Sequence, residues 1–253
     1  MRAQVSLACL PGRPVLEAMR FVTDNGLVEP VFGSLGTDHV QLVPQSRGCI
    51  NDELIDVLLE AFPAVQFRLH ANVRLTVGQR LADLSNYESH ADYFIEAARV
   101  SQRLRAPVYS AHSGRRRNAT FAQLVDNTLR CEDLFGCPVA IEGQYPSARG
   151  EELLVSSWAE YGQLLEANVF FAIDLSHLSI LATASGDRSM ALVQELVSSP
   201  RCIEVHVSDN DGRWDQHKVC DRPTWWSSVL PSIHENCVVF SEGNHRSNIE
   251  RFV

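Results

Sequence analysis

Histidine and acidic residues stand at the ends of six consecutive apolar runs in this chain. The runs with their polar ends read FRLHAN, VYSAHSG, VAIEG, FAIDLSH, CIEVHVSDNDGRWDQH and VVFSEGN. The polar residues at these ends are His70, His112, Glu142, Asp174, His177, His206, Asp209, Asp215, His217 and Glu242. Imidazole nitrogens combined with carboxylate oxygens suit zinc, manganese, iron or cobalt. Because so many carboxylates would repel one another without a cation between them, we predict a divalent metal site.

Taken singly, each of these residues fits a simpler structural role. A histidine at a strand end is more often a hydrogen-bonded structural residue, and an acid there often caps the following helix. The coincidence across six successive strands is what favours metal. Other histidines lack this placement: His90 and His234 fall in helical segments near the surface, and His39 precedes its strand. His245 follows Glu242 and is a weaker candidate for a substrate contact.

The elements that position these side chains are short apolar strands alternating with amphipathic helices. The expected strands are Val5–Ala8, Val40–Val43, Val65–Leu69, Pro107–Ala111, Val139–Ile141, Val169–Ile173, Ile203–Val207 and Val238–Phe240. The expected helices include Asn51–Phe62, Ala91–Leu104, Thr120–Phe135, Ser156–Glu166 and Arg188–Val197. This alternation implies parallel strands joined by right-handed crossovers. Such strands bring the residues that follow them to one common face.

Eight such units in 253 residues predict an α/β fold, a (β/α)₈ TIM barrel in a single domain spanning residues 1–253. No linker divides the sequence. An open doubly wound sheet is the alternative, but no GxGxxG turn follows the first strand. In a barrel, the strand ends that carry the histidines and acids form the active-site face.

Composition narrows the possible partners and compartment. The chain carries 31 acidic and 22 basic residues, a formal net charge of −9, which disfavours nucleic acid and membrane surfaces as partners. The seven cysteines form no CxxC pair, and several lie in apolar runs, so we expect reduced thiols in a cytoplasmic protein. No run approaches the length of a membrane-spanning helix. The sequence gives no indication of the oligomeric state.

The motifs resemble those of the xylose isomerase-like TIM barrel superfamily, which includes sugar-phosphate isomerases and epimerases and endonuclease IV. HVSDNDGRWDQH is similar to an HxxDxxG…DxH stretch, AHSG to HPG, IEG to the metal-bridging glutamate, DLSH to DxxH and HANVRL to HAxYxINL. The resemblance implies that Glu142, Asp174, His206 and Glu242 form the metal set of the epimerases. It implies that the larger set of trinuclear members is completed by His70, His112, His177, Asp215 and His217. One to three divalent ions (Fe, Mn, Zn or Co) are therefore expected.

The sequence departs from this pattern in ways that leave the branch open. After DQH the chain reads KVCDRPTWWSSV, where isomerases and endonucleases continue with Gly-x-Gly. IEGQYPS, DLSH and the following tryptophans also resemble the multinuclear non-haem iron enzymes of methanobactin biosynthesis, which modify cysteine in peptides. That branch reads ENxPS and DxSN, so Gly143 and His177 depart from it as well.

Three enzymatic hypotheses follow. The first is an isomerase or epimerase of a small sugar-like or hydroxy-carbonyl substrate, with Glu142 and Glu242 exchanging a proton on opposite faces. Arg115, Lys218 or Arg246 would bind an anionic group of that substrate; Arg116 and Arg117 are further candidates. The second is an iron-dependent oxidoreductase acting on a short peptide or amino-acid thiol. Trp225 and Trp226 would then provide a docking surface, but a buried aromatic pair under the loop is the favoured interpretation. The third is endonuclease IV-like phosphodiester hydrolysis. A non-catalytic binding barrel is the alternative outside enzymes.

Overall fold

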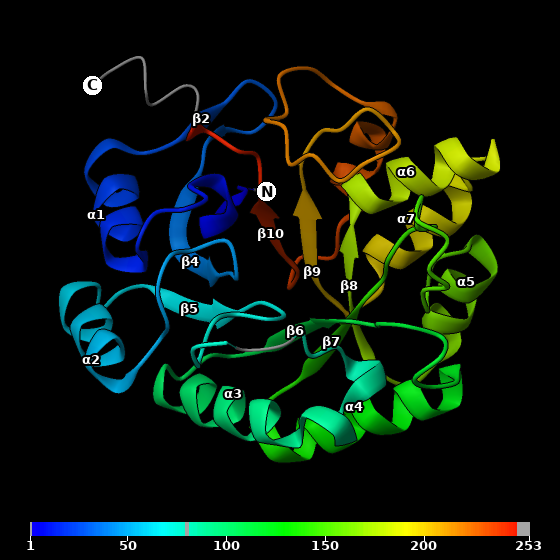
Figure 1. Ribbon diagram of the computed structural model, residues 1–253. Coiled ribbons are helices and arrows are strands. Elements are labelled where there is room, and N and C mark those ends of the chain that lie inside the picture. Colours follow the sequence, from blue (N-terminus) through cyan, green and yellow to red (C-terminus); the bar gives the residue numbers. More distant parts are fainter. Residues whose placement is uncertain (1, 79–80, 247–253) are drawn as a thin grey trace.

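Eight parallel strands close into a barrel in the computed structural model, which describes residues 2–78 and 81–246 (Figure 1). The barrel strands are β1 (Gln4–Ser6), β4 (Gly36–Leu42), β5 (Gln66–Leu69), β6 (Tyr109–His112), β7 (Val139–Glu142), β8 (Phe170–Asp174), β9 (Cys202–Val207) and β10 (Val238–Ser241). Each strand pairs with its neighbour in chain order, and β1 closes the barrel by pairing with both β4 and β10. The predicted TIM barrel is confirmed, and the open doubly wound alternative is wrong.

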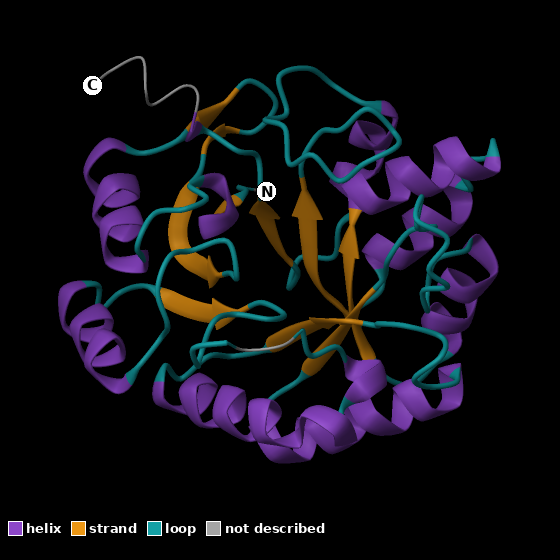
Figure 2. Cartoon of the chain, in the orientation of Figure 1, coloured by secondary structure: helices purple, strands orange, loops and turns teal. Residues whose placement is uncertain are grey.

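The helices form a layer around the strands (Figure 2). They are α1 (Val15–Asn25), α2 (Asp52–Ala61), α3 (Ala91–Arg103), α4 (Phe121–Phe135), α5 (Trp158–Glu166), α6 (Leu175–Ser185) and α7 (Met190–Ser198). Their starts follow the local sequence: the Asn51 side chain accepts a hydrogen bond from Leu54 N at 2.9 Å, and Thr120 and Gln123 form a capping box on α4. Gly136 ends α4 in the left-handed conformation, with φ of 68°.

Short elements fill the connections between strands and helices. They are the 3₁₀ segments η1 (Leu7–Cys9), η2 (Leu84–Asn86), η3 (Glu88–His90) and η4 (Trp225–Ser232), and a hairpin of β2 (Val28–Glu29) and β3 (Gly33–Ser34). The expected first strand Val5–Ala8 runs too far, because the Ser6 side chain caps η1 and turns the chain at Leu7. Within the described residues, no helix is long and apolar enough to span a membrane.

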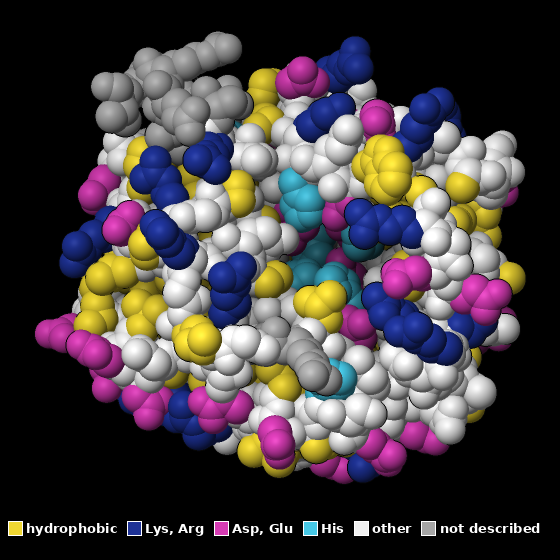
Figure 3. Space-filling view, viewed as in Figure 1, with side chains coloured by type: hydrophobic (Ala, Val, Ile, Leu, Met, Phe, Trp, Pro, Cys, Tyr) yellow, Lys and Arg dark blue, Asp and Glu magenta, His cyan; other side chains and the backbone are white. Residues whose placement is uncertain are grey.

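The strand ends all open on one face of the barrel. In the register of β6 with β7, His112 lies opposite Glu142, and in that of β8 with β9, Asp174 lies opposite His206. Seen from this side, histidine and acidic side chains gather in a hollow near the centre of the molecule (Figure 3). The fold therefore brings together residues that lie up to 172 positions apart in the sequence, His70 to Glu242.

Candidate metal centre

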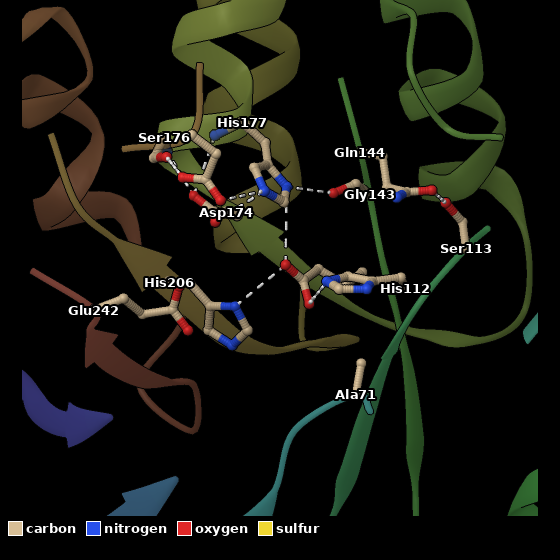
Figure 4. Close-up of polar contacts among 12 residues, drawn as sticks. Ala71, His112, Ser113, Gly143, Gln144, Asp174, Ser176, His177, His206 and Glu242 are labelled. Carbon is tan, nitrogen blue, oxygen red and sulfur yellow. Dashed lines mark hydrogen bonds and ion pairs between the residues drawn. The ribbon is translucent and has the colours of Figure 1, made fainter. Parts of the chain in front are cut away.

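Glu142, the last residue of β7, stands in the middle of this hollow with its side chain buried. Its Oε2 atom lies 2.9 Å from His70 Nε2 and 3.7 Å from His112 Nε2. Its Oε1 atom lies 3.5 Å from His206 Nδ1 and 3.8 Å from His177 Nδ1. One carboxylate thus contacts histidines from four different strand ends. Three of them, His112, His177 and His206, surround a common point in the close-up (Figure 4).

Asp174 and His177 form a second part of the hollow, where β8 passes directly into α6. Asp174 Oδ1 accepts hydrogen bonds from Ser176 N at 2.6 Å and His177 N at 3.2 Å, so this carboxylate caps the helix. Its other oxygen, Oδ2, lies 3.4 Å from His177 Nε2. The same Nε2 atom lies 3.6 Å from Asp215 Oδ2, which comes from the loop after β9. Capping and ligand-like contacts are therefore served by different oxygens of Asp174.

His206 and Glu242 complete the hollow from β9 and the end of β10. Donor atoms of His70, His206 and Glu242 lie within 4.8 Å of one another, as do those of His70, His112 and Glu142, and those of Glu142, Asp174 and His177. His217 bridges two parts of the hollow, with Nε2 at 2.9 Å from Asp215 Oδ2 and Nδ1 at 3.5 Å from Glu242 Oε2. The structure thus brings together the nine side chains that the resemblance implied as metal ligands, whereas Asp209 pairs through its backbone with Lys218.

The histidines and carboxylates of the hollow shift one another's pKa values strongly. Burial would raise the pKa of Glu142, but the surrounding histidines hold it well below its usual range. Burial would lower the pKa of His217, yet its hydrogen bond to Asp215 and the charge of Glu242 raise it to about 10. For His206, too, the charge of Glu142 outweighs burial and raises the pKa. The carboxylates therefore favour positive charge next to them, whether as protons on imidazole or as metal.

The residues fit a divalent metal. Glu142 Oε2 and His206 Nδ1 are buried, yet neither has a hydrogen-bond partner among the described residues, since their short contacts lack hydrogen-bond geometry. Buried polar atoms are normally satisfied, so an unsatisfied atom on each of two side chains that contact one another indicates a missing partner. Nitrogen and carboxylate donors clustered at this spacing suit zinc, manganese, iron or cobalt.

A buried ion pair beneath the hollow supports His206 and was missed in the sequence. Glu204 Oε2 lies 3.2 Å from His206 Nε2, and Glu204 Oε1 accepts from Arg68 Nη1 at 3.0 Å. Burial would raise the pKa of Glu204, but the hydrogen bond from His206 and the charge of Arg68 lower it to about 2. The sequence does contain a sign of this pair, because Arg68 interrupts the apolar run FRL and Glu204 interrupts the apolar run IEVHV. This pair orients the imidazole from outside the ligand set.

A cleft of about 320 Å³ opens beside the hollow. Its lining includes His112, His177, Asp215, Tyr145 and Trp214, and the Tyr145 ring lies 4.7 Å from the His177 ring. Arg149 is the basic residue in this lining. Cavities of this size accept small-molecule ligands. Tyr145, Arg149 and Trp214 were not identified from the sequence, because they lie in loops beyond the strand ends.

The three basic residues expected to bind an anionic group are not part of the lining of this cleft, although Arg115 pairs with Glu151, which is. Arg115 forms an ion pair with Glu151 at 2.9 Å, and the Lys218 backbone pairs with Asp209. Arg246 lines a different cleft, with Arg13 and Arg47. None of the three lines the cleft beside the hollow, so their predicted role gains no support from the structure.

The other histidines are placed mostly as expected. His39 pairs with Gln66, the first residue of β5, and so lies at the opposite end of the barrel from His70. His90 and His234 are half-buried rather than exposed. His245 is buried, and its Nε2 lies 3.1 Å from Glu29 Oε1, away from the cleft lining. The suggestion that His245 contacts substrate therefore gains no support.

Solved structures with the same architecture cover nearly the whole chain. A D-tagatose 3-epimerase-like protein matches 99% of this chain and 94% of its own, with 15% identity and a TM-score of 0.67. An AP endonuclease of family 2 from Brucella melitensis matches 97% and 93%, with 17% identity and a TM-score of 0.67. The fold is that of the xylose isomerase-like TIM barrels.

A third match concerns the metal. The IolI protein, solved with a bound zinc atom, matches 95% of this chain and 88% of its own, with 13% identity and a TM-score of 0.60. That barrel thus binds a divalent ion, in accord with the buried His, Glu and Asp clusters here. No protein-family model and no curated protein matches the chain.

Proposed function

We propose that this chain is a metal-dependent isomerase or epimerase of a small sugar-like or hydroxy-carbonyl substrate. The observation that carries the proposal is that two buried carboxylates from different strand ends, Glu142 and Glu242, both lie near His206. Glu142 contacts His206 directly, and Glu242 groups with His70 and His206. Proton exchange on two faces of a carbon requires two such groups at one centre.

In this mechanism the substrate enters the cleft lined by Tyr145 and Trp214. Trp214, 49% exposed, offers an aromatic face to the apolar face of a sugar ring. One glutamate removes the proton next to the substrate carbonyl, and the other returns a proton to the opposite face. His70, His112, Glu142, Asp174, His206 and Glu242 would hold divalent metal, whose Lewis acidity stabilises negative charge on the substrate oxygens.

Proton exchange with solvent tests the proposal directly. The metal-loaded protein is incubated in deuterium oxide with a panel of ketohexoses, ketopentoses and their phosphates, and NMR follows deuterium at the carbon next to the carbonyl. We expect incorporation with at least one member, reduced about 10²–10⁴-fold in Glu242→Gln, because general bases contribute factors of this size. The exposed Glu195→Gln in α7 serves as the matched control and should keep the wild-type rate.

A variant can lose proton exchange either because it no longer binds metal or because it lacks the catalytic base, and these two causes must be distinguished. Elemental analysis of each variant makes this distinction, and Glu142→Ala should lose both bound metal and exchange because Glu142 contacts four of the candidate ligands. Complete absence of deuterium incorporation across the panel by fully loaded wild-type protein would contradict the proposal. So would Glu142→Ala protein that keeps full metal content.

A second candidate, phosphodiester hydrolysis, is favoured by one feature. His177, Asp215 and His217 contact one another in addition to the four residues of the expected epimerase set. Centres with two or more metals support hydrolytic displacement at phosphorus. Nicking of a duplex oligonucleotide with one abasic site is its test. The iron-dependent oxidative hypothesis finds no counterpart in the epimerase-like protein, the endonuclease or the zinc-binding barrel.

A further inference from the structure

A separate group of potential ligands lies at the seam where the barrel closes. Cys9 ends η1 after the first strand, Glu29 ends β2, and His245 follows the last strand. The three are buried, with 0%, 0% and 3% of their surface exposed. One donor atom from each lies within 4.8 Å of the other two, and no member belongs to the three ligand groups of the candidate metal centre.

The contacts of Glu29 leave one oxygen without a partner. Its Oε1 atom accepts a hydrogen bond from Ser241 Oγ and lies 3.1 Å from His245 Nε2. Its Oε2 atom is buried and has no hydrogen-bond partner among the described residues. A buried carboxylate oxygen is rarely left unsatisfied, because desolvation costs free energy that nothing returns. The unpaired oxygen of Glu29 therefore points to a bound cation.

A plain ion pair and a reactive cysteine both fit these contacts less well. An ion pair between Glu29 and His245 would leave Glu29 Oε2 without a partner and would not explain why Cys9 lies beside them. A nucleophilic cysteine would need access and a basic partner, but Cys9 is fully buried and its thiol donates to the Ser241 carbonyl at 3.1 Å. Burial and then the charges of Glu29 and Glu242 raise the pKa of the Cys9 thiol, the opposite of activation.

We infer that Cys9, Glu29 and His245 form a second metal site, structural in role and suited to zinc. Sulfur, imidazole and carboxylate donors are all zinc ligands, whereas the candidate metal centre contains no thiol. Cys220 is a further buried thiol close to the segment that carries Glu29, since its carbonyl accepts a hydrogen bond from Val31 N at 3.3 Å. Zinc at this place would deprotonate the thiol that it binds.

The backbone around the group is closely packed. A Cβ added at Gly243 would lie 2.8 Å from Val219 Cα and 2.9 Å from Glu29 Oε1, so only glycine lets the chain after β10 pass here. His245 N donates to Cys9 O at 2.9 Å, which joins the first and last segments of the barrel. A metal bound to Cys9, Glu29 and His245 would fix the segment that carries Glu242, three residues before His245.

Cobalt titration distinguishes the two sites, because only a thiolate ligand gives an intense sulfur-to-cobalt absorption in the near ultraviolet. Metal-free protein is titrated with Co²⁺ for wild type, Cys9→Ser, the buried control Cys131→Ser, and Asp174→Asn. We expect the thiolate absorption in wild type, Cys131→Ser and Asp174→Asn, and its loss in Cys9→Ser. Asp174→Asn should lose only the cobalt of the candidate metal centre, which has no sulfur ligand. The thiolate absorption therefore tests the site at the barrel seam whether or not the proposed function is correct.

The inference is overturned if wild-type protein at saturating Co²⁺ shows no thiolate absorption, or if Cys9→Ser keeps it while folded by circular dichroism. Where Cys9→Ser does not fold, zinc X-ray absorption of the wild-type protein decides. A sulfur shell at about 2.3 Å supports the site, and a spectrum with nitrogen and oxygen alone contradicts it.

Discussion

Arg68 links the buried interior of the barrel to a candidate metal ligand through one intermediate residue, Glu204. Its guanidinium is buried inside the barrel and pairs with Glu204, and Glu204 in turn orients His206. Gln41 Nε2 also lies 3.3 Å from Glu204 Oε2 and 3.0 Å from His206 Nε2. These contacts connect the buried charge of Arg68 to the candidate ligand His206. We therefore expect the same residues to affect both the stability of the fold and metal binding.

Replacing Arg68 by methionine should therefore affect both properties. The change removes the cationic partner of Glu204 and leaves it only His206 and Gln41, and removing one partner of a buried ion pair costs up to about 3–5 kcal/mol. Urea unfolding measures this loss. The double variant Arg68→Met, Glu204→Leu removes both charges and should recover most of it. If Arg68→Met unfolds at the wild-type urea concentration, the pair has no such role.

At the level of elements, the loop after β9 brings Asp215 and His217 to the candidate metal centre. Its ends are closed by two backbone hydrogen bonds between Asp209 and Lys218, at 2.8 and 2.9 Å. Inside it, Ser176 Oγ donates to Asp215 Oδ1 at 3.0 Å, and His217 adopts a left-handed φ of 46°. This strained backbone places Asp215 beside His177 of α6 and His217 beside Glu242.

The double variant Asp215→Asn, His217→Asn tests this loop. If the loop and α6 bind an ion of their own, elemental analysis should find one metal fewer per chain than in wild type, with the others retained. Asp211→Asn, in the same loop but exposed, is the matched control and should keep the wild-type content. An unchanged metal content in the double variant would show that Asp215 and His217 bind no ion.

The same level shows what the sequence could and could not predict. The eight strands were predictable because each contains a short apolar run. Six of these runs end at a histidine or an acid, and parallel closure aligns those ends. Helix α6 was missed because it begins directly at Asp174 and is apolar on nearly all sides, so no periodicity marks it. The pairing of Arg68 with Glu204 joins residues 136 positions apart, which only the closed barrel brings together.

Across the whole molecule, metal binding and folding should be linked. The candidate ligands come from the ends of six barrel strands, β5 to β10, and from the loop after β9, and unfolding separates them. An ion that binds only the folded chain stabilises it by about 2.7 kcal/mol at a free concentration of 100 Kd. For a chain of this size each kcal/mol shifts Tm by roughly 2–4 °C, so chelation should lower Tm by roughly 5–11 °C.

Scanning calorimetry with and without a chelator measures this shift, and Glu142→Ala separates its sources. The variant lacks the carboxylate shared by two of the three ligand groups of the candidate metal centre but keeps Cys9, Glu29 and His245. Its Tm should therefore fall less on chelation than that of wild type, and the remaining shift measures the site at the barrel seam. Equal Tm values for chelated and metal-loaded wild-type protein would show that the gathered carboxylates are balanced by imidazolium protons alone, and that the barrel closes without any ion.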